Sequence, residues 1–220
     1  MASSAKPAQS PRVLAETLLS VIEKDIVPLT EEGVKSGSKV FGSAVLAQDL
    51  KPITVATNNE AESPLWHAEI NCIHQFFNAN TSSTRPAPGN CVFLATHEPC
   101  SLCLSGIAWG GFKEFYFLFT YEDTRDMFEI PYDINILEEV FRVRAEGESD
   151  TSLSSRTLYN KSNKFFRAKS LVDLVEEIED EAQKKQLQAE VVRVKNMYKE
   201  LSNTYQEGKK QGIDTASVLK

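Results

Sequence analysis

The 220-residue sequence predicts an α/β fold in which a central sheet lies between layers of helices. Two patterns predict it: apolar residues recur at helical spacing in several segments, and short, nearly all-apolar runs are typical of strands covered on both faces. The two patterns alternate along the chain as helix, strand, strand, helix, strand, helix, strand. This order is typical of a sheet that buries its faces under helices.

The first half of the sheet domain is expected to contain two helices and two strands. Apolar spacing predicts a helix over residues 13–27 that ends at Pro28. Residues 39–48 and 52–57 are interpreted as strands around a short turn. Residues 64–80 predict the second helix, and the Ser-, Thr-, Pro- and Gly-rich stretch behind it ends that helix.

The second half is expected to alternate buried strands with helices. Residues 91–96 (CVFLAT) and 114–121 (EFYFLFTY) predict two buried strands. Between them a helix is expected to begin near Pro99, which suits a first turn, and to end at a Gly-Gly pair. Residues 134–143 predict one more helix.

Composition along the chain predicts one main domain with an extension. We expect a disordered N-terminus (1–12), a sheet domain (13–145), a polar linker (146–157), a C-terminal helical extension (158–206) and a flexible tail (207–220). The extension carries a narrow apolar seam with two interpretations, a helix packed on the core, which its short length favours, or a dimer contact. The seam residues are Leu187, Val191, Val194, Tyr198, Leu201 and Tyr205.

Charge and hydropathy make nucleic acid and membranes less favoured partners. The net charge of -7 disfavours a polyanion such as free nucleic acid. No apolar run approaches the roughly 20 residues that span a bilayer, and the N-terminal residues lack an apolar signal-peptide core. The sequence therefore predicts a cytoplasmic protein, with the nucleus left open, and no membrane association.

Two cysteines three residues apart predict a metal site. Cys100 and Cys103 stand i and i+3 at the expected start of a helix, so their sulfurs lie on one side of it. The positive end of the helix dipole favours their thiolates. With His67 from the preceding helix they make three ligands for Zn²⁺, and three protein ligands with a fourth position for water are typical of catalytic zinc.

The fourth ligand and the general base decide what such a site does. His74 and His97 are the candidates for a fourth protein ligand, and neither is better placed than water. Glu69 is the candidate base that accepts a proton from that water. Residues two apart point away from each other on a regular helix, so His67 and Glu69 converge only if they stand at a helix start.

The paired motif resembles the zinc-dependent cytidine deaminase-like superfamily. The chain reads His67-Ala68-Glu69 and then Pro99-Cys100-Ser101-Leu102-Cys103, which match H-x-E and P-C-x-x-C. Residues 13–143 are most similar to the branch of guanine deaminases, cytosine deaminases and tRNA adenosine deaminases. The matching stretches are FGSAV, TNN, SPLWHAEI and EPCSLCLSGIAW, the last being most like guanine deaminases.

The resemblance implies a three-layer α-β-α sandwich with a central mixed five-stranded sheet, here with a C-terminal helical extension. It implies a hydrolase in which Glu69 shuttles protons while zinc-bound hydroxide displaces ammonia from a ring. Guanine or guanosine is the favoured substrate, with cytosine or cytidine left open, and a homodimer is expected. Asp133 lies where relatives place acidic residues that contact purines.

The resemblance also implies substrate contacts. Asn58 matches an asparagine that contacts the base or sugar, although Asn59 is equally available, and the backbone N–H of Ala68 matches a donor to a substrate carbonyl. Trp109 is a candidate for an aromatic pocket wall, against a core position. His97 is a candidate pocket residue, against a hydrogen-bonded histidine at a strand end.

Two other functions remain open. Residues 163–169 (NKFFRAK) interleave cations with aromatics and resemble a segment of tRNA adenosine deaminases, which makes RNA a less favoured partner. The acidic run at 176–181 argues against it, because it repels phosphates. The other alternative is an inactive zinc-binding partner protein, and the presence of Glu69 argues against that.

Overall fold

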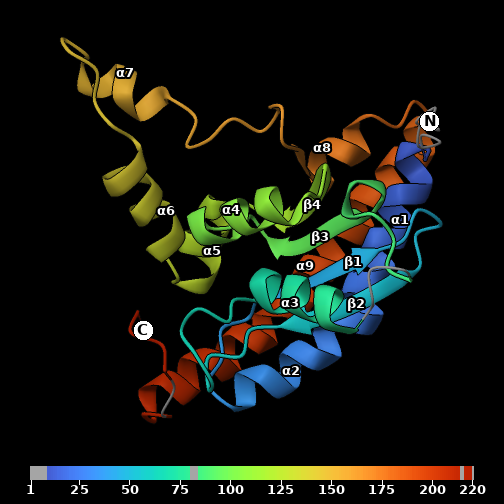
Figure 1. The fold of residues 1–220 in the computed structure, drawn as a ribbon, viewed down its shortest axis with the longest axis horizontal. Helices are drawn as coiled ribbons and strands as arrows, with labels where there is room; N and C mark the ends of the chain where they lie inside the picture. Colours follow the sequence, from blue (N-terminus) through green and yellow to red (C-terminus); the bar gives the residue numbers. More distant parts are fainter. Residues whose placement is uncertain (1–8, 80–83, 214–215, 220) are drawn as a thin grey trace.

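The computed structural model describes residues 9–79, 84–213 and 216–219. Most of the expected N-terminal disorder (1–12) lies outside the described residues, and residues 11 and 12 already belong to a helix. Among the described residues, no helix is both long enough and apolar enough to cross a membrane. The strands form one sheet, with helices on both sides of it (Figure 1).

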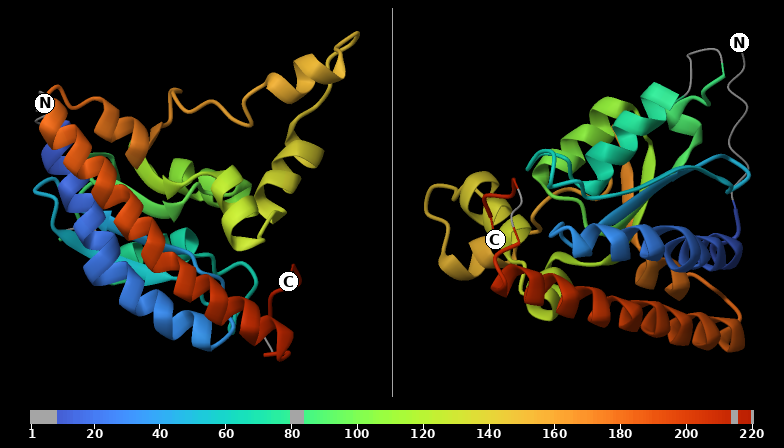
Figure 2. Two further views of the ribbon diagram at one scale, coloured as in Figure 1. Left: turned by 180° about the vertical axis from the view of Figure 1, so that it is seen from behind. Right: turned by 90° about the horizontal axis from the view of Figure 1, so that it is seen from below.

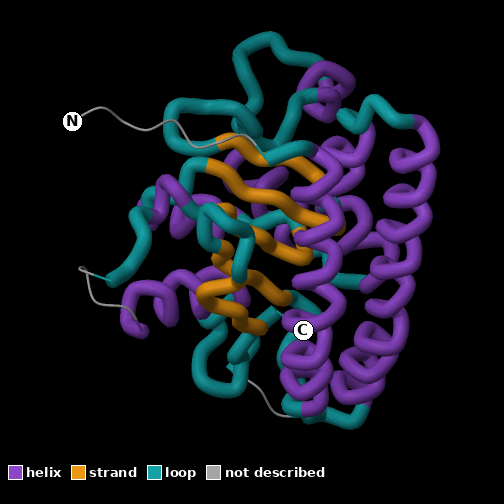
Figure 3. The backbone as a smooth tube through the Cα atoms, turned by 90° about the vertical axis from the view of Figure 1, so that its right-hand side faces the viewer, coloured by secondary structure: helices purple, strands orange, loops and turns teal. Residues whose placement is uncertain are grey.

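The sheet is mixed and has five strands in the order β2-β1-β3-β4-β5, which confirms the expected fold. Strand β1 pairs with β2 and with β3 in antiparallel orientation, whereas β3, β4 and β5 are parallel to one another. The strands lie side by side in Figure 3. Their bounds are β1 Gly42–Leu46, β2 Pro52–Thr57, β3 Val92–His97, β4 Glu114–Phe119 and β5 Arg167–Ser170.

Both faces of the sheet are covered, as the all-apolar strands predict. In β3, the side chains of Val92 and Leu94 join one core cluster and that of Phe93 joins the other, because successive strand residues point to opposite faces. One face packs against α3 and α4, and the other against α1, α2, α8 and α9 (Figure 2). The bounds are α1 Pro11–Val21, α2 Val27–Lys35, α3 Ala68–Ala79, α4 Ser101–Gly110, α8 Leu171–Glu176 and α9 Glu181–Lys210.

The first helix does not end at Pro28, contrary to the sequence prediction. A π-helical turn, Ile22–Ile26, joins α1 to α2, and the N–H of Val27 bonds to the carbonyl of Ile22. Proline lacks an N–H and clashes with the carbonyl four residues back. The wider π turn displaces the backbone there, so the helical path continues through the proline to Lys35.

The C-terminal region is part of the sheet domain rather than a separate extension. It supplies the fifth strand, β5, which pairs with β4. The apolar seam of α9 is buried in the same cluster as the inner strands, which confirms packing on the core. Helix α9 runs to Lys210, and residues 216–219 lie against the sheet domain, so the expected division at 158–206 and 207–220 differs from the structure.

Between β4 and β5 the chain makes a long excursion outside the layers (Figure 1). It begins with α5, Tyr121–Phe128, which the sequence analysis missed. Helix α6, Tyr132–Ile136, continues as a π-helical turn, Leu137–Phe141, where a helix was expected over 134–143. The expected linker, 146–157, carries a short helix, α7 Asp150–Ser155, and the chain then returns to β5.

Candidate active site

The start of α3 brings His67 and Glu69 to one place. The helix begins at Ala68, and the carbonyl of His67 accepts the first helical hydrogen bond, from Asn71 at 2.8 Å. His67 therefore stands just outside the helix while Glu69 lies in its first turn. This is the convergence at a helix start that the spacing required.

The start of α4 positions the two cysteines. The N-cap of α4 is Cys100, and Cys103 lies one turn further on, with both side chains buried. The first amides of a helix have no intrahelical partner and favour anionic groups. The helix ends at Gly110, and the next residue, Gly111, caps it with a φ of 82°, the left-handed conformation common at this position.

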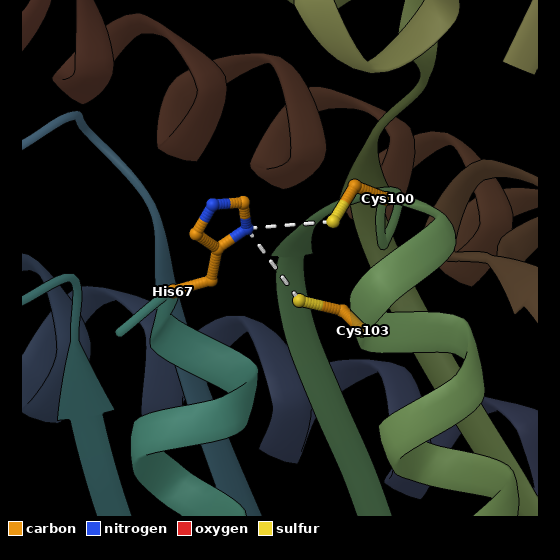
Figure 4. Close-up of side chains that lie close together, drawn as sticks. All are labelled: His67, Cys100 and Cys103. Atoms are coloured by element: carbon orange, nitrogen blue, oxygen red, sulfur yellow. Dashed lines mark hydrogen bonds between the residues drawn. The ribbon is translucent and has the colours of Figure 1, made fainter. Parts of the chain in front are cut away.

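The side chains of His67, Cys100 and Cys103 fit a zinc ion. Nδ1 of His67 lies 3.4 Å from the Cys100 sulfur and 3.7 Å from the Cys103 sulfur (Figure 4). Nitrogen and sulfur ligands at ordinary zinc distances and a tetrahedral angle lie about 3.6 Å apart. Within the described part of the chain, no fourth Cys, His or carboxylate joins the group.

The other histidines are committed elsewhere. The ring of His74 lies 4.9 Å from that of Trp66 on the outer side of α3. The ring of His97 lies 4.7 Å from that of Phe119, on the opposite face of the sheet. The site therefore matches the three-ligand pattern of catalytic zinc rather than a closed structural site.

The carboxyl of Glu69 is buried beside the three ligand side chains. Its carboxylate accepts a hydrogen bond from the Cys103 thiol at 3.3 Å and is only 6% exposed. Burial, together with the negative charge of Cys100, raises the pKa of Glu69 to about 7. Hydrogen bonds from Cys103 and His67 hold the pKa of Cys100 well below its ordinary value despite its burial. A carboxyl with a pKa near neutrality suits general acid–base catalysis.

A cavity of about 350 Å³ opens beside His67 and Cys100. Its volume lies at the low end of ordinary ligand pockets, about 300 to 1,000 Å³. Asp133 from α6 lines it, and burial with the Cys100 charge raises the pKa of Asp133 to about 7. The apolar lining residues are Phe41, Pro64, Leu65, Leu102, Ile130, Ile136, Val218 and Leu219.

Two expected substrate contacts are made within the protein instead. The side-chain oxygen of Asn58 accepts the backbone N–H of Ala68 at 2.7 Å. Both residues are buried, and neither lines the cavity. Asn59 bonds to Glu62 at 2.8 Å on the exposed loop. The pairing of Asn58 with Ala68 fixes the loop before α3, because it joins the end of β2 to the helix start.

The structure does not bring Trp109 or His97 to the cavity. The side chain of Trp109 is 92% exposed at the end of α4, so it is neither a pocket wall nor a core residue. His97 is the last residue of β3, and its side chain points to the face covered by α9, where it contacts Phe41 and Tyr198. Strand alternation sends it away from the helices that carry the metal ligands.

Several lining residues carried no signal in the sequence. Lys39 and Glu60 form a buried ion pair of 2.5 Å beside the cavity. Ser217 donates to the carbonyl of Leu219 and accepts from Lys39, so residues 217–219 form part of the cavity wall. The C-terminal segment was expected to be a flexible tail. Its place beside the cavity became evident only from the contact between Ser217 and Lys39 in the structure.

Residues 24–119 match the family model described as the cytidine and deoxycytidylate deaminase zinc-binding region, and this range includes His67, Glu69, Cys100 and Cys103. This part of the chain belongs to the cytidine deaminase-like superfamily of zinc-dependent deaminases. As in other members of that superfamily, the His–Cys–Cys group is a zinc site. No curated protein sequence matches the chain.

Solved structures of deaminases resemble the chain at low identity. A guanine deaminase from Bacillus subtilis is 24% identical over 68% of this chain and 86% of its own, with a TM-score of 0.46. A guanine deaminase from Nitrosomonas europaea is 15% identical over 84% of this chain and 86% of its own, with a TM-score of 0.43. A structure from a study of tRNA:A34 deaminases is 19% identical over 44% of this chain and 74% of its own, with a TM-score of 0.39.

Proposed function

We propose that this protein is a hydrolytic deaminase of a free nucleobase or nucleoside, with guanine-like substrates favoured, and that it releases ammonia. The observation that carries the proposal is the position of the buried Glu69 carboxyl beside the three zinc ligands, two of which, His67 and Cys100, line a cavity of about 350 Å³. These are the parts that hydrolysis of an amino group on a ring requires.

Zinc, when bound, supplies Lewis-acid activation of the attacking water. Glu69 accepts the proton of that water and delivers protons to a ring nitrogen and to the departing amine. Burial raises the pKa of Glu69, which favours a carboxyl that can both accept and release a proton. The apolar side chains of Phe41 and Leu102 line the cavity and favour a flat ring while excluding bulk water.

The cavity favours a small, uncharged substrate. Among its described lining residues Lys39 is the one Lys or Arg, and its charge is paired with Glu60. The carboxyl of Asp133 also lines the cavity and repels anions when it is ionised. A phosphate group therefore finds no free cation there, which favours a base or nucleoside over a nucleotide. The preference for guanine rests on the resemblance of EPCSLCLSGIAW to guanine deaminases.

RNA editing is less well supported. Of the cations in residues 163–169, Lys169 pairs with Glu177, and the neighbouring Lys161 pairs with Glu98 at 3.0 Å. A phosphate backbone would have to break these pairs. Phe165 remains 50% exposed, so the segment still offers one ring for stacking.

A homodimer is also proposed, on the resemblance. The exposed ring of Trp109 supports it, because a large aromatic side chain is commonly buried at an interface. Light scattering after size exclusion measures the mass directly. A dimer that Trp109→Ala converts to monomer is the expected result, and a monomeric wild-type protein contradicts it.

The deciding experiment compares zinc-loaded wild-type protein with Glu69→Gln. Ammonia release is measured with guanine, guanosine, cytosine, cytidine, adenine, adenosine and a tRNA. We expect turnover of one base or nucleoside, and a loss of about 10²- to 10⁴-fold or more in the variant, because the proton shuttle is removed. Zinc content and circular dichroism should be equal in the two proteins.

Three other results would change the proposal. Turnover of tRNA alone would make the protein an RNA-editing enzyme. Full zinc occupancy with no turnover of any compound would make it an inactive partner. Substantial activity in Glu69→Gln would disprove the role of that carboxyl.

A further inference from the structure

Lys39 is a buried cation in the wall of the cavity. It lies between α2 and β1, its side chain is 8% exposed, and it lines the same cavity as His67 and Cys100. A buried lysine is costly unless its charge is paired and its hydrogens are bonded. The partners of its ammonium group therefore need to be accounted for.

Two of its three hydrogens have partners. The ammonium donates to Oε1 of Glu60 at 2.5 Å and to the hydroxyl of Ser217 at 2.7 Å. An ammonium group has three N–H donors. Within the described part of the chain, the third finds no acceptor.

The side chains of Glu60 and Asn58, next to the ammonium, are hydrogen-bonded in turn. Oε2 of Glu60 accepts the backbone N–H of Lys39 at 2.7 Å and the side-chain amide of Asn58 at 3.2 Å. Asn58 uses its oxygen on Ala68. These contacts fix the position of the Glu60 carboxylate, which in turn holds the Lys39 ammonium. The residual donor is thus preorganised, and its charge is neutralised by its partner.

A neutralised, fixed N–H donor suits a neutral oxygen acceptor better than a phosphate. The substrates named above differ in this respect: guanine and cytosine carry a ring carbonyl besides the amino group, whereas adenine carries none. The backbone N–H of Ala68, which the family resemblance matched to a donor for a substrate carbonyl, is occupied by Asn58. The cavity therefore requires another donor for that oxygen.

We propose that Lys39, held by Glu60 and Ser217, donates a hydrogen bond to the ring carbonyl of the substrate and thereby selects amino-oxo bases over bases without a carbonyl. This inference rests on the proposed function and extends it to the substrate class. A site built to bond one polar atom rejects analogues that lack it, because the protein donor is then left unpaired.

The test uses pairs of ligands that differ at the carbonyl: guanine against 2-aminopurine, and cytosine against 4-aminopyrimidine. Binding is measured by calorimetry in the zinc-loaded Glu69→Gln protein, and kcat/KM in the protein with Glu69 intact. Lys39→Met is combined with Glu60→Gln, so that no unpaired carboxylate stays buried.

The matched control is Lys161→Met with Glu98→Gln. Here too a lysine forms an ion pair with a buried glutamate, with Nζ of Lys161 at 3.0 Å from Oε1 of Glu98, but neither residue lines the cavity. We expect the oxo base to bind about 10- to 100-fold more tightly than its analogue in the parent and in the control, the range for a hydrogen bond from a charged donor. In the double variant, Lys39→Met with Glu60→Gln, the ratio of the two affinities should fall to within about threefold of unity.

The outcomes separate this inference from the function it rests on. A parent protein that deaminates an oxo base, with an unchanged ratio in the Lys39 variant, overturns the role of Lys39 and leaves the function standing. A parent that turns over adenine as well as guanine also overturns it. A parent that neither binds nor deaminates any base removes both.

Discussion

The side-chain oxygen of Asn58 accepts a hydrogen bond from the backbone N–H of Ala68 at 2.7 Å. This bond joins the first residue after β2 to the first residue of α3. His67 and Glu69 flank Ala68 on either side. The position of the metal ligand and of the proton carrier therefore depends on a hydrogen bond that touches neither of them.

Asn58→Ala should destabilise the protein by about 1 to 3 kcal/mol, because it leaves the buried N–H of Ala68 without a partner. The measurement is the free energy of unfolding in denaturant. The matched control is Asn59→Ala, whose side chain bonds to Glu62 near the surface and should cost less than about 0.5 kcal/mol. Equal stability of the two variants would contradict the fastening role.

The sequence predicted the metal site because its determinants are local. The spacing of Cys100 and Cys103 fixes their relation within one helical turn, and the first turn of α3 does the same for His67 and Glu69. The sheet was predicted for a similar reason, since most residues of β3 and β4 are apolar.

The contacts that the sequence analysis missed join distant residues. Lys39 is 21 residues from Glu60 and 178 from Ser217, and no local pattern connects them. Strand β5 reads RAKS, four residues without apolar alternation, and only its pairing with β4 makes it a strand. Trp109 was misplaced because helical spacing alone does not say which face of α4 meets the sheet.

Cys100→Ser should remove the zinc. A serine hydroxyl is a poor substitute for a thiolate ligand, and the two remaining ligands hold zinc weakly. We expect less than about one tenth of the wild-type zinc content by atomic emission, together with a lower melting temperature, because binding to the folded state stabilises it. Cys91→Ser, at a buried cysteine outside the ligand group, is the control and should keep its zinc. Retention of zinc by the Cys100 variant would show that another residue completes the site.

His97 should make the protein less stable in mild acid. Burial, with a contribution from the charge of Lys195, lowers the pKa of His97 well below 6.5. In mild acid, His97 is therefore protonated in the unfolded chain but stays neutral in the folded protein. Stability is therefore full above about pH 6.5 and falls below it, by up to about 1.4 kcal/mol per pH unit. His97→Phe, which keeps a ring beside Phe119 and Phe128, should flatten this slope between pH 6.5 and 5. Denaturant unfolding at three pH values measures it, and parallel slopes in the two proteins would rule out His97 as the source.

Removing Lys39 should reverse the direction in which the stability contributed by Glu60 changes with pH. Burial alone would raise the pKa of Glu60, but the charge and hydrogen bonds of Lys39 outweigh it and lower that pKa below 4.5. In the wild type, the stability from Glu60 is therefore full above pH 4.5 and is lost as the pH falls through the lowered pKa.

In Lys39→Met, burial dominates and the pKa of Glu60 rises above 4.5. The folded variant then favours the protonated carboxyl, so its stability is full below pH 4.5 and is lost as the pH rises through the raised pKa. The loss relative to wild type should grow from pH 4.5 to 7.5 and reach about 3 to 5 kcal/mol, as for other broken buried pairs. Unfolding in denaturant measures it. Adding Glu60→Gln to Lys39→Met removes the titrating group, so the growth with pH should disappear; a loss in the single variant that is constant with pH would show that Glu60 does not depend on Lys39 for its charge.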